Sequence, residues 1–507
     1  MSMIKKTISN TVSNYVHTLL QLITGIYLTR IIFFGLGEVG YGFWTLAWAI
    51  FGYSILVDFG FGYSVQKMTA EYSVNDEEDE YNGHISTIFF FYLLVGPCIS
   101  LIAFALSFFL DTIFTFPEGT DIAYYQSTFR WFGLLVGLTL PFGAAPEILA
   151  GLNRLTLRNC VRITFLFINL AGTYLLFHWG YGLFTLAIFA AGVPLLSNIV
   201  TGLIAFRLLP KAKLRWNYVS LKHLSAISQF GLFAYISTFT NLIIMKSDQI
   251  MLGSGISIPA IAIYQVGSRV AELLHRFCTQ FQENITPIIA SLREQGDRKS
   301  ISLVLLHSNR FIVFFSTGVY ILTMLFSSEI LYCWLKVTDP IYTQVSYLLL
   351  TARYVTIIFH SATHRALLLC GRHRLAGLCA AIEAVLNIVL SILLVRVLGV
   401  LGVCWGTLIS TTLINVFLVF PFGCRQADIP VTTMLRASFL PAVLAGIPTA
   451  AIVLVFKNAM AAESSAFGLL TMGTLLLSGI YLALSYLIFL DSAERNKVSG
   501  RLRSLRT

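Results

Sequence analysis

Charge is what this sequence has least of. Asp, Glu, Lys and Arg make up 11% of its 507 residues, whereas 57% are hydrophobic. Soluble domains carry roughly 25% charged residues, so most of the surface of this chain cannot be in contact with water. The composition therefore excludes a cytosolic enzyme, a secreted domain and a disordered chain.

Several chemical motifs are also missing. The eight cysteines are scattered without a Cys-x-x-Cys spacing, which predicts small packing residues rather than a zinc site or a disulfide framework. No Gly-Lys dipeptide occurs, so there is no Walker A loop to hydrolyse ATP. Gly-x-Ser-x-Gly and His-Glu-x-x-His are absent as well. We therefore expect no catalytic residue, no metal and no cofactor.

Long apolar runs take the place of these motifs. A membrane-spanning helix needs about 20 predominantly apolar residues, and about fourteen runs meet that measure. They lie at residues 11–35, 40–62, 84–110, 124–150, 156–178, 183–207, 225–252, 258–288, 306–333, 342–368, 375–397, 400–422, 434–456 and 466–490. The runs are too long and too uniformly apolar for β-barrel strands. The sequence predicts an all-α polytopic membrane protein.

Lys and Arg gather in alternate connections between these runs. Examples are the segments around Arg158, Lys213 and Arg298 and the basic tail after residue 494. Because positive charge favours the cytoplasmic side, both termini are expected to be cytoplasmic. The net charge of +10 then reflects topology, and we expect no nucleic-acid partner.

A weak internal repeat divides the predicted spans. The stretch 151–154 followed by Gly180 resembles the stretch 371–374 followed by Gly399, although chance recurrence of Gly and Leu is the alternative. Two parallel six-helix units would form two lobes around a central cavity. The predicted domains are an N-lobe at 1–222, a C-lobe at 223–425 and two extra spans with a basic tail at 426–507.

Five stretches resemble the polysaccharide-biosynthesis (Wzx-type) flippases of the MOP exporter superfamily, which also holds the MATE drug exporters and the lipid II flippases. The stretches are 28–44 (LTRIIFFGLGEVGYGFW), 57–68 (VDFGFGYSVQKM), 248–253 (DQIMLG), 287–297 (PIIASLREQGD) and 371–410. Each is degenerate, whereas their order and the span count together are fairly specific. The resemblance implies two six-helix lobes plus two C-terminal helices, which rock to expose a cavity to either side.

The resemblance also implies a cargo: a saccharide linked to a polyprenyl diphosphate. The expected protein is a flippase of the bacterial inner membrane that carries this cargo to the outer leaflet for O-antigen, capsule or exopolysaccharide synthesis. Membrane lipid and other polysaccharide-assembly proteins are the further expected partners.

The eighth span carries a polar stripe on one helical face. Its members, at spacings of three and four, are Gln265, Arg269, Glu272, Arg276, Gln280 and Glu283. Facing lipid, the three charges nearest the middle would cost about 8–10 kcal/mol together. The stripe must therefore line water or a partner, and we expect it to bind substrate; a buried network of ion pairs is the alternative.

Two further spans carry candidate residues. Asn14, His17 and Gln21 share a face of the first span, where their amide and imidazole groups suit a sugar or, alternatively, polar packing between helices. Arg353, His360 and His364 share a face of the tenth span. We expect Arg353 to bind substrate and the two histidines to act in gating or ion coupling, since histidine titrates near neutral pH.

Charged residues near span ends are the remaining candidates. Asp58, Lys246 and Asp248 lie close to the predicted membrane surfaces, where long side chains reach water. They are expected to form gates or ion pairs.

A flippase for an anionic lipid-linked saccharide is the leading interpretation. A MATE-like antiporter is less favoured because cation export needs carboxylates without neighbouring arginines. A membrane-embedded polymerase or glycosyltransferase is less favoured because the predicted outer connections are short. A scaffold would not need polar stripes on several spans.

Overall fold

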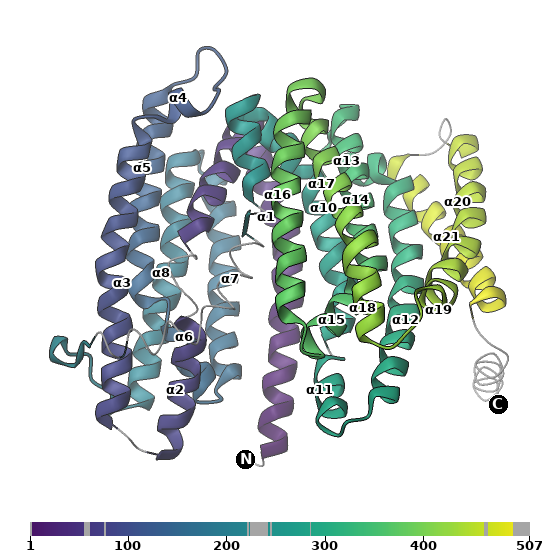
Figure 1. Ribbon diagram of the computed structural model, residues 1–507. Helices are drawn as coiled ribbons and strands as arrows, with labels where there is room; N and C mark the ends of the chain where they lie inside the picture. The colour runs from purple at the N-terminus through teal and green to yellow at the C-terminus, as the bar shows by residue number, and fades with distance from the viewer. Residues whose placement is uncertain are drawn as a thin grey trace, which may run out of the picture. The chain divides into compact units, whose positions relative to one another are not determined.

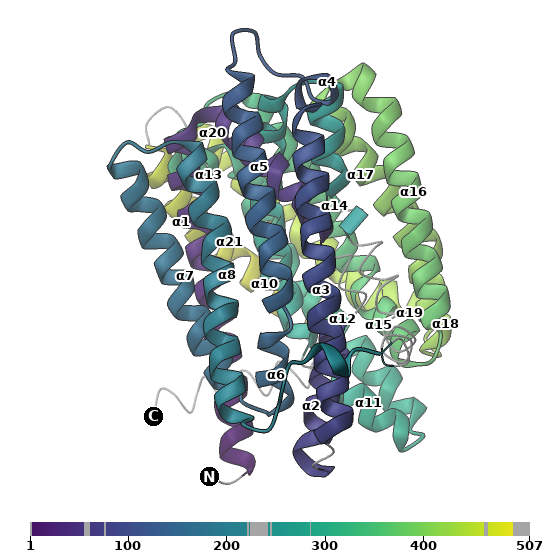
Figure 2. The same ribbon diagram turned by 90° about the vertical axis from the view of Figure 1, so that its left-hand side faces the viewer.

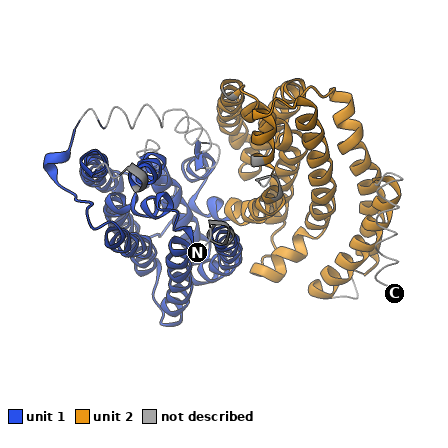
Figure 3. Ribbon diagram, turned by 90° about the horizontal axis from the view of Figure 1, so that it is seen from below, with its two compact units in different colours: residues 1–262 blue, residues 263–507 orange. Residues whose placement is uncertain are grey.

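In the computed structural model, the described residues are 3–54, 61–75, 78–220, 223, 242–243, 246–283, 285–460 and 465–489. Within these ranges the chain forms helices and connecting turns, without β-strands (Figure 1). It packs into two compact units, Met1–Ala262 (unit 1) and Ile263–Thr507 (unit 2), which Figure 3 colours separately. The predicted all-α class is confirmed, and the lobe boundary at residue 222 stays a prediction.

Unit 1 is a bundle of long helices with short connections. They are α1 (Met3–Gly52), α2 (Phe61–Asn75), α3 (Glu78–Ser107), α4 (Leu110–Ile113), α5 (Ile122–Thr139), η2 (Leu140–Phe142), α6 (Ala145–Gly151), α7 (Leu155–His178), α8 (Leu183–Leu208) and η3 (Trp216–Tyr218). Helix α5 packs between α3 and α8, and α7 packs against α8 and α1 (Figure 2).

Helix α1 is two helices joined at Gly37, where φ is +67° and ψ is −176°. This backbone conformation is open essentially to glycine alone. The first part follows α7 to its end, where Gly35 lies against Phe177. The second part turns back and follows α5, where Phe51 contacts Phe132 (Figure 1). The element thus holds the first predicted span and the larger part of the second, up to Gly52.

The fourth predicted span is broken. Helix α5 ends at Thr139, the short η2 carries Pro141, and α6 begins two residues before Glu147, with Pro146 in its first turn. Proline lacks the amide hydrogen that an α-helix interior needs, which explains the interruption. The helix therefore changes from α to 3₁₀ geometry in the middle of this span, while Ile122–Gly151 remains one candidate membrane span.

Unit 2 contains the remaining helices. They are α10 (Ile258–Glu283), whose first turn falls in unit 1, α11 (Thr286–Glu294), α12 (Arg298–Leu325), α13 (Ser327–Leu335), α14 (Pro340–Phe359), α15 (Ser361–Leu369), α16 (His373–Leu398), α17 (Val400–Ile414), the π-helical η4 (Asn415–Val419), α18 (Phe420–Gln426), α19 (Val431–Met434), the π-helical η5 (Leu435–Phe439), α20 (Leu440–Met460) and α21 (Ala466–Ile488). The axes of α14 and α15 differ by 48° at His360.

Ten helices in the described ranges are long and apolar enough to cross a membrane, or eleven if α14 and α15 form one broken span. The prediction of about fourteen is larger for three reasons. Two predicted spans fall wholly or largely within α1, the predicted span 225–252 falls almost entirely outside the described residues, and α10 is long enough but too polar. The chain is a multi-pass membrane protein.

Helices α3 and α5 cross at a point of close backbone contact. A Cβ added to Gly96 would lie 2.4 Å from the carbonyl oxygen of Gly137, and one added to Gly137 would lie 2.5 Å from that of Gly96. Small residues at such crossings let helices in membranes approach closely. Any larger side chain at either position must separate the two helices.

Candidate functional site

Helix α10 presents its polar stripe on its less buried face. Gly267 and Cys278 lie on the packed face, with Gly267 against Val345 of α14. On the stripe, Gln265 is buried, Arg269, Glu272 and Gln280 are partly buried and Arg276 is exposed. The side chain of Glu283 lies outside the described atoms. The predicted one-sided arrangement of these side chains is present in the structure.

One of the two ion pairs expected along the stripe is formed. Arg269 Nη1 lies 3.5 Å from Glu272 Oε2, and the two side chains are 43% and 25% exposed. Glu272 and Arg276 form no ion pair in this described helix. Between residues 269 and 276 the stripe has two arginines and one carboxylate, so this middle part carries one excess positive charge, which Glu283 balances at the end of the helix.

His275 joins this stripe to a neighbouring helix. It interacts electrostatically with Arg276 on its own helix, with Arg353 of α14 and with His360, the residue after α14. Arg276 and Arg353, which the sequence placed on separate spans, thus both act on the same histidine. Sequence reasoning missed His275 because it lies beside the helical face that Arg269, Glu272 and Arg276 share.

His360 occupies the break between α14 and α15. Its Nδ1 lies 2.7 Å from Asn415 Oδ1, and Asn415 Nδ2 donates to the Thr411 carbonyl. A carbonyl oxygen only accepts, so Nδ1 of His360 carries the hydrogen and donates it. The His364 ring stacks on His360 with centroids 4.2 Å apart. The hinge of one broken span thus bonds to the π-helical segment of another.

Glu383 of α16 completes this network. Its Oε1 accepts a hydrogen bond of 2.9 Å from the Thr411 hydroxyl, and its charge acts on His360. No partner could be assigned to Glu383 from the sequence alone, because Thr411 lies on another helix and His360 lies at the break between α14 and α15. Among the described residues, no group of three or more His, Cys, Asp and Glu side chains is placed to hold a metal ion.

A second basic cluster lies in unit 1. Arg158 and Arg162 of α7 lie 3.6 and 4.0 Å from the Glu147 carboxylate of α6, and both act electrostatically on His17 of α1. The sequence identified the arginines only as topology markers and assigned no partner to Glu147. With two arginines and one carboxylate, this cluster is also positively charged.

The stripe on α1 is partly engaged with α7. Asn159 Nδ2 donates to Asn14 Oδ1 over 3.0 Å, and Asn10 Nδ2 donates to Asn153 Oδ1 over 2.7 Å. Gln21 is exposed on α1. Polar packing between helices thus uses the first part of the stripe and leaves His17 and Gln21 further along it.

Two of the three expected gate residues, Lys246 and Asp248, lie in the described part of unit 1. Asp248 is buried in unit 1 and acts electrostatically on Tyr53, and the Lys246 side chain lies beside Gly52. Asp58 lies outside the described residues. These contacts connect the segment before α10 to the end of α1.

The long apolar helices and the charged stripe on one helix define a class: polytopic membrane proteins with a polar helical face. A family model described as polysaccharide biosynthesis protein matches residues 3–293, and the chain belongs to that family. This confirms the resemblance seen in the sequence. No curated protein matches the chain.

Solved structures share the fold. The lipid II flippase MurJ in an inward closed conformation has a TM-score of 0.72 at 14% identity, covering 95% of this chain and 99% of its own. A multidrug resistance MATE transporter of the MOP superfamily, inward-facing, has 0.64 at 17% identity, covering 81% and 94%. A MOP superfamily transporter from Pyrococcus furiosus has 0.57 at 14% identity, covering 84% and 96%.

The names of these solved structures describe a flippase and transporters. At 14–17% identity they show that this chain has the same fold. The family, described as polysaccharide biosynthesis, fits the predicted saccharide cargo better than the MATE-like alternative.

Proposed function

We propose that the protein flips a saccharide linked to a polyprenyl diphosphate from the cytoplasmic to the outer leaflet, for the synthesis of a cell-surface polysaccharide. The observation that carries this proposal is the excess positive charge between Arg269 and Arg276 of α10, in a member of the polysaccharide biosynthesis family. Three ionised groups on a membrane helix would cost about 8–10 kcal/mol against lipid, so they face water or an anion.

The diphosphate is the part of the cargo that this stripe fits. Arg269 and Arg276 lie two turns apart on one face, with Glu272 between them and Arg353 near Arg276 through His275. Guanidinium groups match phosphate oxygens with two parallel hydrogen bonds each. Glu272 holds Arg269 when the site is empty, and an incoming diphosphate exchanges places with this carboxylate.

The saccharide requires neutral donors and acceptors. Gln265 and Gln280 flank the charges on α10, and His17, Gln21 and Asn14 follow one face of α1. Amide and imidazole groups both donate to and accept from sugar hydroxyls. Since Asn14 already accepts from Asn159, His17 and Gln21 are the stronger candidates on α1.

Alternating access would connect the two leaflets. We assign gating to the ion-bearing segment of Lys246 and Asp248, to Asp58 and to the hinge formed by His360 and His364. The 48° break at His360 and its bond to the π-helical Asn415 support this assignment, because irregular helices absorb changes of backbone angle. The lobes would be residues 1–222 and 223–425, with 426–507 as an added pair of spans.

The proposed setting is the bacterial inner membrane with both termini cytoplasmic. The alternating Lys and Arg connections support this orientation. The partners would be the lipid-linked saccharide, membrane lipid and other polysaccharide-assembly proteins.

The test uses Arg269→Ala with Arg276→Ala in cells that lack the wild-type gene. At equal membrane abundance, the double variant should accumulate lipid-linked saccharide on the inner leaflet. Arg269→Lys should retain part of the flipping rate, because ammonium attracts phosphate without the two-pronged geometry. Glu272→Gln should be tolerated better than either alanine variant.

Arg396→Ala is the matched control, since Arg396 is an exposed arginine of α16 in the same unit. Normal flipping by the arginine double variant would refute the proposed binding of the diphosphate by Arg269 and Arg276. The stripe would then be a structural ion network. Loss of flipping by the control variant would show that the assay reports general damage to unit 2.

A further inference from the structure

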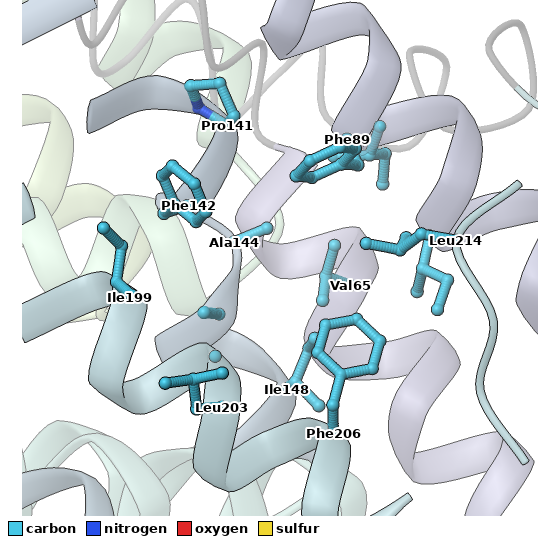
Figure 4. A pocket seen from close by; sticks show the side chains of 14 residues that line it. Val65, Phe89, Pro141, Phe142, Ala144, Ile148, Ile199, Leu203, Phe206 and Leu214 are labelled. Carbon is cyan, nitrogen blue, oxygen red and sulfur yellow. The ribbon is translucent and has the colours of Figure 1, made fainter. Parts of the chain in front are cut away.

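Unit 1 contains a cavity that the proposed transport site does not use. Its volume is about 200 Å³, and every side chain that lines it is apolar. Val65, Phe89, Phe142 and Phe206 come from four different elements and surround one space (Figure 4). Helical interiors rarely leave voids much larger than a water molecule. Apolar cavities of about 150 Å³ stay dry and take up apolar molecules.

The 3₁₀ turn in the fourth span forms one wall of the space. Pro141 and Phe142 of η2 line the cavity between the end of α5 and the start of α6. The facing walls come from α2, α3 and α8.

The cavity adjoins the outer apolar face of α8. Leu203 lines the cavity and is 62% exposed. Leu196 and Val200 lie on the same helical face at spacings of four and three and are also exposed. On a membrane span, such a face meets hydrocarbon. A lipid chain can therefore enter the cavity sideways from the bilayer.

A strap, residues 209–220, closes the cavity at the end of α8. Its backbone is tied to α3: Lys213 N donates to Asn82 Oδ1 over 2.8 Å, and Arg215 N donates to Ser86 Oγ over 3.2 Å. Leu214, between them, lines the cavity (Figure 4). The strap thus holds one side chain in the cavity and its two neighbours outside.

Those two neighbours are exposed cations. Neither Lys213 nor Arg215 has a carboxylate partner among the described residues, whereas Lys211 pairs with Glu78 at 2.7 Å. Trp216 follows, 65% exposed and with its ring 4.9 Å from that of Phe90. Lysine, arginine and tryptophan at the end of a span are typical of the headgroup region and attract anionic lipid.

We propose that this cavity holds one hydrocarbon chain of an anionic phospholipid, whose phosphate lies against Lys213 and Arg215. The apolar lining fits the chain, and the two cations beside Leu214 fit the headgroup. The lipid belongs to the leaflet next to the strap and is distinct from the cargo. Its role is to fill the space beside η2 and to fasten the strap to the membrane.

The experiment measures phospholipid bound to the full-length protein in detergent by native mass spectrometry. The probes are phosphatidylglycerol and zwitterionic phosphatidylcholine with the same chains. Wild type should bind one phosphatidylglycerol tightly. Lys213→Gln with Arg215→Gln should weaken that binding at least about tenfold while leaving phosphatidylcholine binding unchanged, because each cation near a membrane contributes to anionic binding.

A second variant tests the chain. Gly202 lines the cavity, and a Cβ placed there would lie 3.5 Å from that of Ala145, so Gly202→Leu fits the helix and fills the space. It should abolish the tight site for phosphatidylglycerol. The matched control is Arg372→Gln with Arg374→Gln, two exposed cations with the same spacing elsewhere, and it should bind as wild type does.

Three results would overturn the proposal. Unchanged phosphatidylglycerol binding in both variants would remove the site. A loss with the cation variant but not with Gly202→Leu would place the lipid outside the cavity. Displacement of phosphatidylglycerol by polyprenyl phosphate, but not by other anionic phospholipids, would assign the cavity to the cargo's tail. None of these readouts depends on flipping, so they test the lipid site separately from the proposed binding of the diphosphate on α10.

Discussion

The ion pair between Lys457 of α20 and Glu329 of α13 gives the strongest prediction of stability. Lys457 Nζ lies 2.9 Å from Glu329 Oε2 and donates to the Leu325 carbonyl over 2.6 Å. The two side chains are only 19% and 14% exposed, so water screens the pair little. Lys457→Met removes the cation and leaves the carboxylate buried.

The magnitude follows from that burial. Breaking a buried pair by removing one partner costs about 3–5 kcal/mol of unfolding free energy, whereas exposed pairs are worth about 0–1 kcal/mol. Replacing both partners by apolar residues is often nearly neutral. We expect Lys457→Met to cost about 3 kcal/mol or more, and the double variant with Glu329→Leu to recover most of that loss.

The assay is reversible unfolding in mixed micelles of rising SDS content, followed by circular dichroism of wild type, both single variants and the double variant. Lys336→Met, an exposed lysine at the end of α13 whose ammonium lies 4.6 Å from the Tyr332 ring centroid, is the control and should change the unfolding free energy by no more than about 1 kcal/mol. A loss below about 1 kcal/mol for Lys457→Met, or additive effects in the double variant, would refute the reasoning.

Two other predictions concern packing and pH. Gly96→Val should separate α3 from α5 at Gly137 and lower the melting temperature in detergent by several degrees. Gly479→Val is the control and should not lower it, because a Cβ at Gly479 meets no other atom. Equal melting temperatures of the two variants would disprove the close crossing. His360→Gln with His364→Gln should flatten the dependence of flipping on pH between about 5.5 and 8. His307→Gln, an exposed histidine of α12, should keep the wild-type profile, and an unchanged profile in the double variant would reduce the pair to packing.

Local patterns in the sequence predicted the helices and the stripe. The spacing of Arg269, Glu272 and Arg276 fixes their common face, because helix geometry depends on neighbouring residues alone. The pair between Arg269 and Glu272 follows from the same spacing. The broken fourth span was also predictable from Pro141, since proline acts on its own helix.

Contacts between distant helices were not predictable. Glu147 meets Arg158 across the turn from α6 to α7, and Glu383 meets Thr411 across two helices. Nothing in a single sequence states which faces of two spans meet. His275 shows a second limit, because its partners on α14 become visible only when the helices are packed together.

The turn at Gly37 has a consequence for how the two parts of α1 can be oriented. No loop separates them, so the backbone of a single residue sets the angle between the helix that follows α7 and the helix that follows α5. A loop would spread a change in that angle over several residues, whereas a side chain at position 37 would place all of the strain on this one turn.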